Sequence, residues 1–310
     1  MPQPPFQSAV VVINATSGSG HTAAWADELA TLFASVGITA TVILAHSGEE
    51  LVSAARKACA AGTTLVVAGG GDGTINAVAA VLIEHDVVLG VLPLGTLNHF
   101  AKDAGIPIEL SDAVALISNG QVARVDVGEV NEKIFLNNSG LGLYPDIVRH
   151  REQQQHRLGR GKWLAFSWAL WSALKRYPFL NLTMRIKDQD RQRKTPFVFI
   201  GNNRYAMEGF HIGEREALDR GQLSLYTTNR TGRLGLVRLM LQAMLGRIRQ
   251  ARDFEQIDFT SLLIESRHAV MRVSTDGEVN MLPTPLRYRI RPGVLQVVLP
   301  AKLPQSESAR

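Results

Sequence analysis

Short apolar segments alternate with amphipathic helical patterns from residue 8 to about residue 120. The apolar segments at residues 10–13, 38–44, 65–67 and 87–92 have the length and composition of buried strands. Between them, and at residues 111–118, apolar positions recur with the spacing of a helix. Strands that alternate with helices over short connections predict a mostly parallel sheet with helices on both faces. We therefore expect a Rossmann-like, three-layer α/β domain over residues 1–122.

The pattern changes after about residue 120, where strand-like segments dominate. Two strands, 122–130 and 133–138, are expected to join at Asn131-Glu132. Further strands are expected at residues 181–187, 196–200, 222–227, 257–266, 270–274, 286–291 and 295–299, with helical runs at 145–158, 162–177 and 234–248. Many strands at hairpin spacing favour an antiparallel, all-β sandwich-like domain. This domain is expected to span residues 123–303, before a polar, disordered tail at residues 304–310.

Loops marked by glycine or proline follow three of the predicted parallel strands, at residues 14–20, 69–73 and 93–98. Ligands of such folds bind beyond the carboxyl ends of the strands, so we expect the three loops to meet at one edge of the sheet. The middle loop lies in Ala68-Gly69-Gly70-Gly71-Asp72-Gly73-Thr74, before a helical run from Ile75. A glycine loop at a helix start presents N–H groups to an anion, which predicts phosphate as the ligand. Asp72 beside a phosphate then requires a metal, a hydroxyl or a ribose.

The first loop places Gly18, Gly20 and Ala23 at the spacing of a dinucleotide fingerprint. The acidic residue that would bind the ribose is missing, since Ala45-His46-Ser47 stands at its expected place. We therefore favour a small-residue phosphate loop over a nicotinamide or flavin site. The pattern G-x-x-x-x-G-K-[ST] is absent from the sequence, so glycine loops and helix ends would have to hold nucleotide phosphates without its lysine.

Three further motifs each have a structural and a functional interpretation. Thr96 and Asn98 in the third loop can bond a ligand, but either also suits a helix N-cap. Asp276-Gly277-Glu278 has the Asp-Gly pair of a tight hairpin turn, whereas its two carboxylates suit a general base or a Mg²⁺ ligand. The aromatic-rich run at residues 162–177 has basic flanks and suits a buried helix or a membrane-facing surface.

Composition narrows the class of protein. The chain has 310 residues, enough for two domains, and its hydrophobic share of 45% is ordinary for a globular protein. Cys59 is the single cysteine, which excludes an intramolecular disulfide and fits a reducing cytosol. The net charge of +5 favours contact with phosphates of nucleic acid or of an anionic membrane, but nucleic-acid recognition motifs are absent. Neither a signal-peptide layout nor a run of about 18 apolar residues occurs, which favours a cytoplasmic protein.

Two motifs taken together strongly resemble the catalytic domain of the diacylglycerol kinase family. They are Gly69-Gly70-Gly71-Asp72-Gly73-Thr74 and Pro93-Leu94-Gly95-Thr96-Leu97-Asn98. That superfamily also holds sphingosine kinases and bacterial lipid kinases. Residues 14–20 resemble its first nucleotide loop, residues 124–128 and 137–142 its inter-domain stretch, and residues 276–278 its late acidic motif. The similarity covers nearly the whole chain, and several motifs in the right order are more specific than any one of them.

The resemblance implies an ATP- and Mg²⁺-dependent transfer of the γ-phosphoryl group to a lipid hydroxyl, with ATP in a cleft between the two domains. It implies Asp276 as general base, with Glu278 beside it in the metal or proton network and Asp126 as an extension of that network. Asp72 would serve both as a catalytic and as a metal-binding residue. The nucleotide would be held by Asn14, Gly18, Gly70, Gly71, Asp72, Gly73, Thr74, Gly95, Thr96 and Asn98.

Two positions depart from the family pattern. His99 stands where relatives commonly carry Asp, which changes the expected metal network. Arg220 precedes Gly221 where the family tends to carry an acidic residue and some bacterial members bind a structural metal. Because arginine cannot ligate a cation, we do not expect that second metal unless Asp219 substitutes.

These observations predict a cytoplasmic lipid kinase that associates peripherally with a membrane surface and binds no nucleic acid. A homodimer is compatible with this prediction. The sequence does not specify the acceptor, which is diacylglycerol or a related lipid. The alternatives are an NAD kinase-like enzyme of the same superfamily and a non-catalytic nucleotide- or lipid-binding protein.

Overall fold

The computed structural model of the protein describes residues 6–18, 20–142, 179–187, 189–208, 211–215, 217–228 and 254–301. The helices expected at residues 145–158, 162–177 and 234–248, and the expected tail, lie outside these residues. The chain divides into two compact units, of which the first comprises Met1–Val125 with Gly293–Arg310 and the second Asp126–Pro292. Residues 293–303, expected in the second domain, therefore belong to the first unit. The reason is that the last strand ends beside a strand of that unit.

The first unit is built on a parallel sheet with the strand order β2-β1-β3-β4-β18. Its strands are β1 (Ser8–Asn14), β2 (Thr39–Ala45), β3 (Leu65–Gly70), β4 (Val88–Pro93) and the second part of β18 (Leu286–Leu299). Every residue of β3 and β4 is buried, as expected for strands covered on both faces. The predicted α/β unit with a parallel sheet is confirmed.

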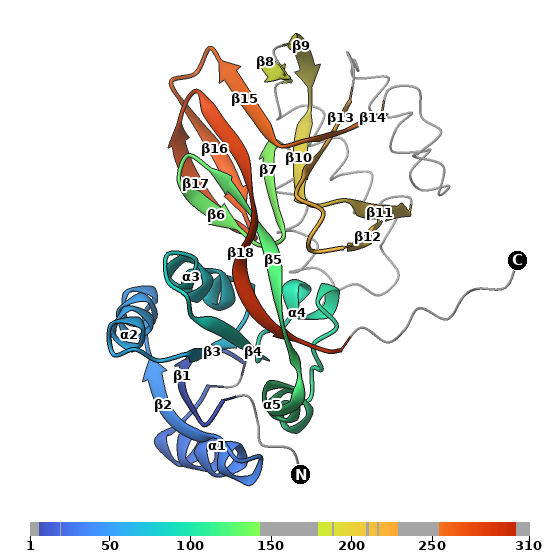
Figure 1. The fold of residues 1–310 in the computed structure, drawn as a ribbon. Helices are drawn as coiled ribbons and strands as arrows, with labels where there is room; N and C mark the ends of the chain where they lie inside the picture. Colours follow the sequence, from blue (N-terminus) through green and yellow to red (C-terminus); the bar gives the residue numbers. More distant parts are fainter. Residues whose placement is uncertain are drawn as a thin grey trace, which may run out of the picture. The chain divides into compact units, whose positions relative to one another are not determined.

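Helices cover both faces of this sheet (Figure 1). On one face α1 (Ala23–Ser35) and α5 (Leu110–Asn119) pack against apolar residues of β1 and β3. On the other face α2 (Gly48–Ala60) and α3 (Asp72–Leu82) lie side by side (Figure 1). A short helix, α4 (His99–Asp103), follows β4 and begins after Asn98, as the N-cap interpretation of that residue implies.

The strand order reverses between β1 and β3. The chain passes from β1 outward to β2 and returns across β1 to β3, so β2 and β3 flank β1 on opposite sides. The crevice at such a reversal, beyond the carboxyl ends of the strands, is the usual ligand site of open α/β sheets. The ends of β1, β3 and β4, at Asn14, Gly70 and Pro93, lie at this edge.

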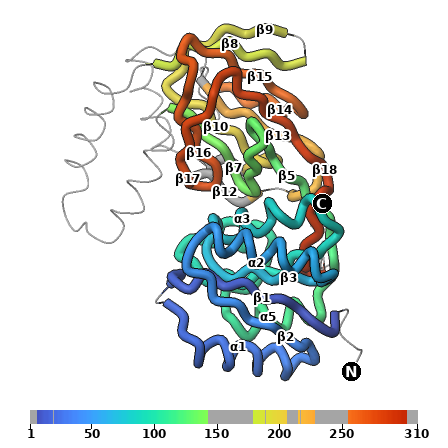
Figure 2. The backbone as a smooth tube through the Cα atoms, turned by 90° about the vertical axis from the view of Figure 1, so that its left-hand side faces the viewer, coloured from blue at the N-terminus to red at the C-terminus, as the bar shows by residue number. Residues whose placement is uncertain are grey.

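The second unit is an antiparallel sandwich, as predicted. One sheet joins the first part of β18 to β15 (Ser261–Ser266), β8 (Leu180–Ile186) and β9 (Gln189–Thr195). The other runs in the order β14 (Phe254–Phe259), β13 (Leu223–Thr228), β10 (Phe197–Asn202), β7 (Asn138–Gly142), β16 (Val270–Thr275) and β17 (Glu278–Pro283). Inward side chains of both sheets share one apolar core, and β16 and β17 form the adjacent strands of a hairpin (Figure 2).

Four shorter or shared strands complete the two units. β5 (Gln121–Val130) begins in the first unit and continues in the second, where it forms a hairpin with β6 (Lys133–Phe135). The turn between them is at Asn131 and Glu132, as predicted, and both residues have positive φ. β11 (Tyr205–Glu208) and β12 (His211–Arg215) form a separate two-stranded sheet.

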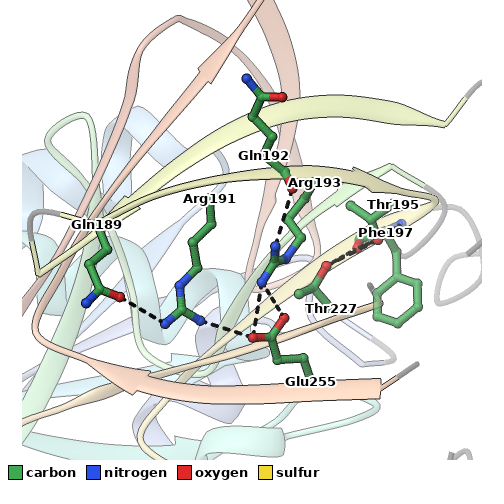
Figure 3. Close-up of polar contacts among 8 residues, drawn as sticks. All are labelled: Gln189, Arg191, Gln192, Arg193, Thr195, Phe197, Thr227 and Glu255. Atoms are coloured by element: carbon green, nitrogen blue, oxygen red, sulfur yellow. Dashed lines mark hydrogen bonds and ion pairs between the residues drawn. The ribbon is translucent and has the colours of Figure 1, made fainter. Parts of the chain in front are cut away.

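Charged side chains connect the edge strands β9 and β14 (Figure 3). The Glu255 carboxylate accepts from Arg193 at 2.8 and 3.2 Å and from Arg191 at 3.1 Å. Beside them the buried Thr227 hydroxyl donates to the Thr195 hydroxyl at 3.2 Å (Figure 3). The strand β9 was not predicted, because its sequence, QDRQRKT, lacks alternating apolar residues.

Candidate active site

The glycine stretch is a strand-to-helix junction rather than an extended loop. Strand β3 continues to Gly70, because Gly69 and Gly70 pair with Leu92 and Pro93 of β4. Helix α3 begins at Asp72, so the predicted loop at 69–73 and helix start at Ile75 were wrong in extent. Gly71 alone connects the two elements and is the N-cap of α3, so the N-cap residue itself has no side chain to bond the first turn. By contrast, α1 and α2 are capped by Thr22 and Ser47, respectively.

Glycine allows the three loops to come into backbone contact. A Cβ at Gly95 would overlap the Cα of Gly71 and lie 3.0 Å from its nitrogen. A Cβ at Gly18, which has a φ of +59°, would lie 3.3 Å from the carbonyl oxygen of Leu94. Gly70 is packed as closely, since a Cβ there would lie 2.5 Å from the hydroxyl of Thr74. The predicted convergence of the three loops at one edge of the sheet is confirmed.

Asp72 connects the second loop to the third. Its carboxylate accepts the backbone N–H of His99 at 3.1 Å and that of Phe100 at 2.9 Å. These are N–H groups of the first turn of α4, so a side chain of α3 provides the N-terminal cap of α4. The charge of the Asp72 carboxylate is thus offset by the N-terminus of α4.

Asn14 connects the first loop to the second. Its side-chain amide donates to the Thr74 hydroxyl at 3.2 Å, while its oxygen accepts the N–H and hydroxyl of Thr16 at 3.0 and 2.8 Å. Thr74, which is buried, lies in the first turn of α3 together with Gly73. Three of the predicted nucleotide residues, Asn14, Asp72 and Thr74, therefore also hold the loops against one another.

Asn98 stabilises the third loop from within. It adopts the left-handed conformation, with a φ of +50°, and is 3% exposed. Its side chain accepts from the Gly95 N–H at 3.1 Å and donates to the carbonyl oxygens of Pro93 and Gly95 at 3.0 and 2.8 Å. Asn98 occupies the N-cap position of α4, but its side chain does not form the cap. Thr96 is exposed and available to a ligand.

His21 closes the first loop and was not singled out from the sequence. Its ring lies on that of Trp25 with centroids 4.0 Å apart, and its buried Nε2 has no hydrogen-bond partner among the described residues. Burial lowers the pKa of His21 from its ordinary value of 6.5. The signal in the sequence is weak, because a histidine before the helix cap Thr22 has no distinctive spacing.

In the second unit, Asp276 and Gly277 form the turn of the β16–β17 hairpin. Their φ values are +47° and +86°, and Thr275 pairs with Glu278 across the turn. Two positive φ values in a two-residue loop define a type I′ turn, for which Asp-Gly is a preferred sequence. The predicted hairpin turn is confirmed.

The two carboxylates of this turn have different environments. Asp276 accepts three backbone N–H groups, from Leu136 at 2.7 Å, Asn137 at 2.8 Å and Asn138 at 3.0 Å. Glu278 is exposed, and none of the described residues forms a hydrogen bond or ion pair with its carboxylate. The Asp276 carboxylate therefore holds the loop at residues 136–138, and the Glu278 carboxylate is available to a ligand.

Asp126 is buried, with 3% exposure, at the loop that carries Arg220. Its carboxylate accepts the N–H of Gly221 at 2.6 Å and the amide of Asn203 at 3.1 Å, while Asn203 accepts the N–H of Arg220 at 3.0 Å. Asn202 donates both to the Asp126 carbonyl, at 2.8 Å, and to the Leu136 carbonyl, at 2.9 Å. Asp126 is thereby connected within the second unit to the loop that Asp276 holds.

The residues that the structure describes contain neither a metal-binding cluster nor a membrane-spanning helix. No three His, Cys, Asp or Glu side chains among those residues form a group that could hold a metal ion. No helix within the same residues is long and apolar enough to cross a membrane.

A parallel α/β unit in one chain with an antiparallel sandwich is the fold of solved structures described as diacylglycerol kinases. Residues 8–130 match the diacylglycerol kinase catalytic domain, and residues 146–299 match the YegS C-terminal NAD kinase β sandwich-like domain. The chain belongs to the YegS-like group of the diacylglycerol kinase catalytic-domain family.

Relatives of similar length support this assignment. The "probable lipid kinase YegS-like" of Pseudomonas aeruginosa PAO1 is 34% identical over 260 residues, which cover 80% of each chain. The protein of the same name from Pseudomonas syringae pv. syringae B728a is 32% identical over 273 residues, covering 84% of this chain and 83% of its own. The fold of a diacylglycerol kinase from Bacillus anthracis str. Sterne matches with a TM-score of 0.68 and 18% identity, covering 95% of this chain and 97% of that one.

Proposed function

We propose that this chain is a kinase that transfers the γ-phosphoryl group of ATP to the hydroxyl of diacylglycerol or a related lipid. The observation that carries the proposal is the start of α3, where the N-cap is the glycine Gly71 and two further loops pack against it through Gly95 and Gly18. Unpaired N–H groups and the positive end of a helix favour a polyphosphate. The family and the names of its members support a lipid as acceptor.

The predicted nucleotide residues divide into two kinds. Gly18, Gly70, Gly71, Gly73 and Gly95 have no side chains, so they would offer only backbone N–H groups to a phosphate. Asn14, Asp72, Thr74 and Asn98 have side chains that hold the loops together, as the hydrogen bonds above indicate. We infer that the exposed Thr96 and the glycine N–H groups contact the nucleotide and that the second set fixes their positions.

In this reaction the lipid hydroxyl oxygen forms a bond to the γ-phosphorus as the bond from that phosphorus to the bridging oxygen of ADP breaks. The hydroxyl proton passes to a base, which needs a carboxylate oxygen that N–H donors do not already occupy. Glu278 meets this requirement better than Asp276, which accepts three N–H groups. We therefore propose Glu278 as the base and Asp276 as the residue that fixes the turn, a refinement of the sequence-based assignment of the base to Asp276.

Mg²⁺ bound to ATP would neutralise charge on the transferring phosphoryl group. This ion usually keeps several waters and takes one or two carboxylates besides phosphates, so no group of three protein ligands is needed. Glu278, whose carboxylate is exposed, fits that mode of binding, whereas both carboxylate oxygens of Asp72 already accept N–H groups of α4. Asp126 fits less well, because Gly221 and Asn203 donate to its buried carboxylate.

The proposal is tested by incubating the protein and extracted membrane lipids with γ-labelled ATP and Mg²⁺, and by identifying any labelled lipid. Glu278→Gln should lower kcat by at least about 100-fold while the KM for ATP changes little, since general-base catalysis contributes on that scale. Asp276→Asn should lower kcat less and also expose the amides of Leu136 to Asn138 to hydrogen exchange. Full turnover by folded Glu278→Gln would remove it as the base.

NAD kinase activity is the second candidate, because the sandwich matches a domain described as NAD kinase-like. Parallel reactions that contain either NAD or lipid as acceptor separate the two candidates. If NAD is phosphorylated and no lipid is labelled, the protein is an NAD kinase and the lipid kinase proposal is wrong. Nucleotide binding without transfer to either acceptor would indicate a binding protein.

We also propose a cytoplasmic protein that contacts a membrane peripherally, and the net charge of +5 supports the contact with an anionic membrane surface. Co-sedimentation with anionic vesicles, and its absence with neutral ones, is the expected result. Sedimentation velocity tests the homodimer.

A further inference from the structure

The loop Leu136-Asn137-Asn138, here called the clasp loop, is held from two sides within the second unit. On one side its three N–H groups donate to Asp276. On the other side its carbonyl oxygens accept hydrogen bonds from Arg215, Asn202 and Tyr205. Leu136 and Asn137 are 1% and 2% exposed, so water does not compete for these groups.

Arg215, the last residue of β12, is the cationic member of this set. Its guanidinium donates to the Leu136 carbonyl at 2.5 Å and to the Asn137 side-chain oxygen at 3.1 Å, and it lies 5.9 Å from the centre of the Tyr205 ring. The residue is 7% exposed. A guanidinium that is so deeply buried is costly unless the surrounding groups stabilise its charge.

The peptide group between Leu136 and Asn137 lies between opposite charges. Its carbonyl oxygen accepts from Arg215, and its N–H donates to Asp276. A cation at the oxygen and an anion at the hydrogen polarise the peptide in the same sense, so each hydrogen bond strengthens the other. Arg215 and Asp276 are thereby coupled through a peptide group.

We propose that Arg215 is a positioning residue for Glu278, and that it acts through the clasp loop and Asp276 to fix the type I′ turn. This inference rests on the proposed function for its kinetic consequences. Glu278 follows that turn directly, and the Asp276 N–H also donates to the Asn138 carbonyl at 2.9 Å. If Arg215 is removed, the clasp loop loses one charged partner. The three N–H groups of that loop, which hold the Asp276 carboxylate, are then no longer fixed in position.

The experiment compares Arg215→Met, Arg215→Lys, Asp276→Asn and the double variant Arg215→Met/Asp276→Asn. Arg215→Met should lower kcat by about tenfold or more with little change in the KM for ATP, because small misplacements of catalytic groups are costly. Arg215→Lys should recover only part of the loss, because lysine cannot reach two acceptors with one planar fork. The double variant should be no slower than the slower single variant, because both changes break one unit.

Arg193→Met is the matched control. It also removes a largely buried arginine from the second unit, but its partner is Glu255 at the sandwich edge. It should lower thermal stability while kcat stays unchanged well below the melting temperature. Unchanged kcat in folded Arg215→Met, or a double variant slowed by the product of the single effects, would overturn the inference.

A second measurement does not depend on activity. Hydrogen exchange at residues 136–138 should accelerate in both Arg215→Met and Asp276→Asn, but not in Arg193→Met. If the wild-type protein phosphorylates no acceptor, the proposed function fails, and this exchange experiment alone decides whether Arg215 fixes the clasp loop. Unchanged protection in Arg215→Met would refute the inference in either case.

Discussion

Replacing Gly95 with alanine tests the three-loop junction at its closest contact. The added methyl carbon would overlap the Cα of Gly71 and lie 2.9 Å from the side-chain oxygen of Asn98. Non-bonded contacts of this kind require about 3.5–4.0 Å, so the third loop must move away from the second by more than about 1 Å. Gly95 has no positive φ, so the effect is one of space and not of backbone conformation.

The cost of this change follows from the packing. Overpacking of this size costs about 1–3 kcal/mol. A protein of typical stability, about 5–15 kcal/mol, stays folded after such a loss. A displacement of about 1 Å at residues that position a substrate can nevertheless lower activity by about 100-fold. The expected result is therefore a folded protein with weakened ATP binding and strongly reduced turnover.

Calorimetric titration with ATP and a lipid phosphorylation assay measure the two effects. Gly48→Ala is the matched control, because a Cβ at Gly48, the first residue of α2, would meet nothing within 4 Å. That control should bind ATP normally and gain up to about 1 kcal/mol in stability. If Gly95→Ala binds ATP as tightly as Gly48→Ala, the three-loop junction is not the nucleotide site.

Two further changes test contacts described above. Asp72→Asn replaces a charged acceptor of two N–H groups, so the free energy of unfolding should fall by about 1–3 kcal/mol. The amide hydrogens of His99 and Phe100 should also exchange faster with solvent. Unchanged exchange at these two amides would contradict the capping function of Asp72. Glu255→Gln removes the charge between Arg191 and Arg193, so stability to urea should fall by about 1 kcal/mol at low salt and by less at high salt. A loss independent of salt would show that removal of the Glu255 charge is not its cause.

Local pattern was sufficient for the elements with a strong apolar period. The buried strands β1, β3 and β4 are short apolar runs, and their parallel arrangement brought the three loops to one edge of the sheet. The Asp276-Gly277 turn was predictable for the same reason, since its conformation depends on two adjacent residues.

Contacts between distant residues were not predictable in this way. Asp72 caps a helix that begins 27 residues later, and nothing in the local sequence marks that partner. Arg215 lies 79 residues from its acceptor Leu136 and stood out in no motif. The last strand reads as two segments, 286–291 and 295–299, although Pro292 and Gly293 continue it as one strand shared by both units.

That shared strand has a consequence for the synthesis of the protein. β18 pairs with β15 in the second unit and with β4 in the first, and it leaves the ribosome after every other strand of the described residues. At about 5–20 residues per second, the α/β part waits roughly ten to thirty seconds for its last strand. During this interval β4 is an open sheet edge to which another nascent chain can bind. Completion of the first unit therefore depends on the last part of the chain to be translated. A chain whose translation ends before residue 293 would have a first unit without its last strand.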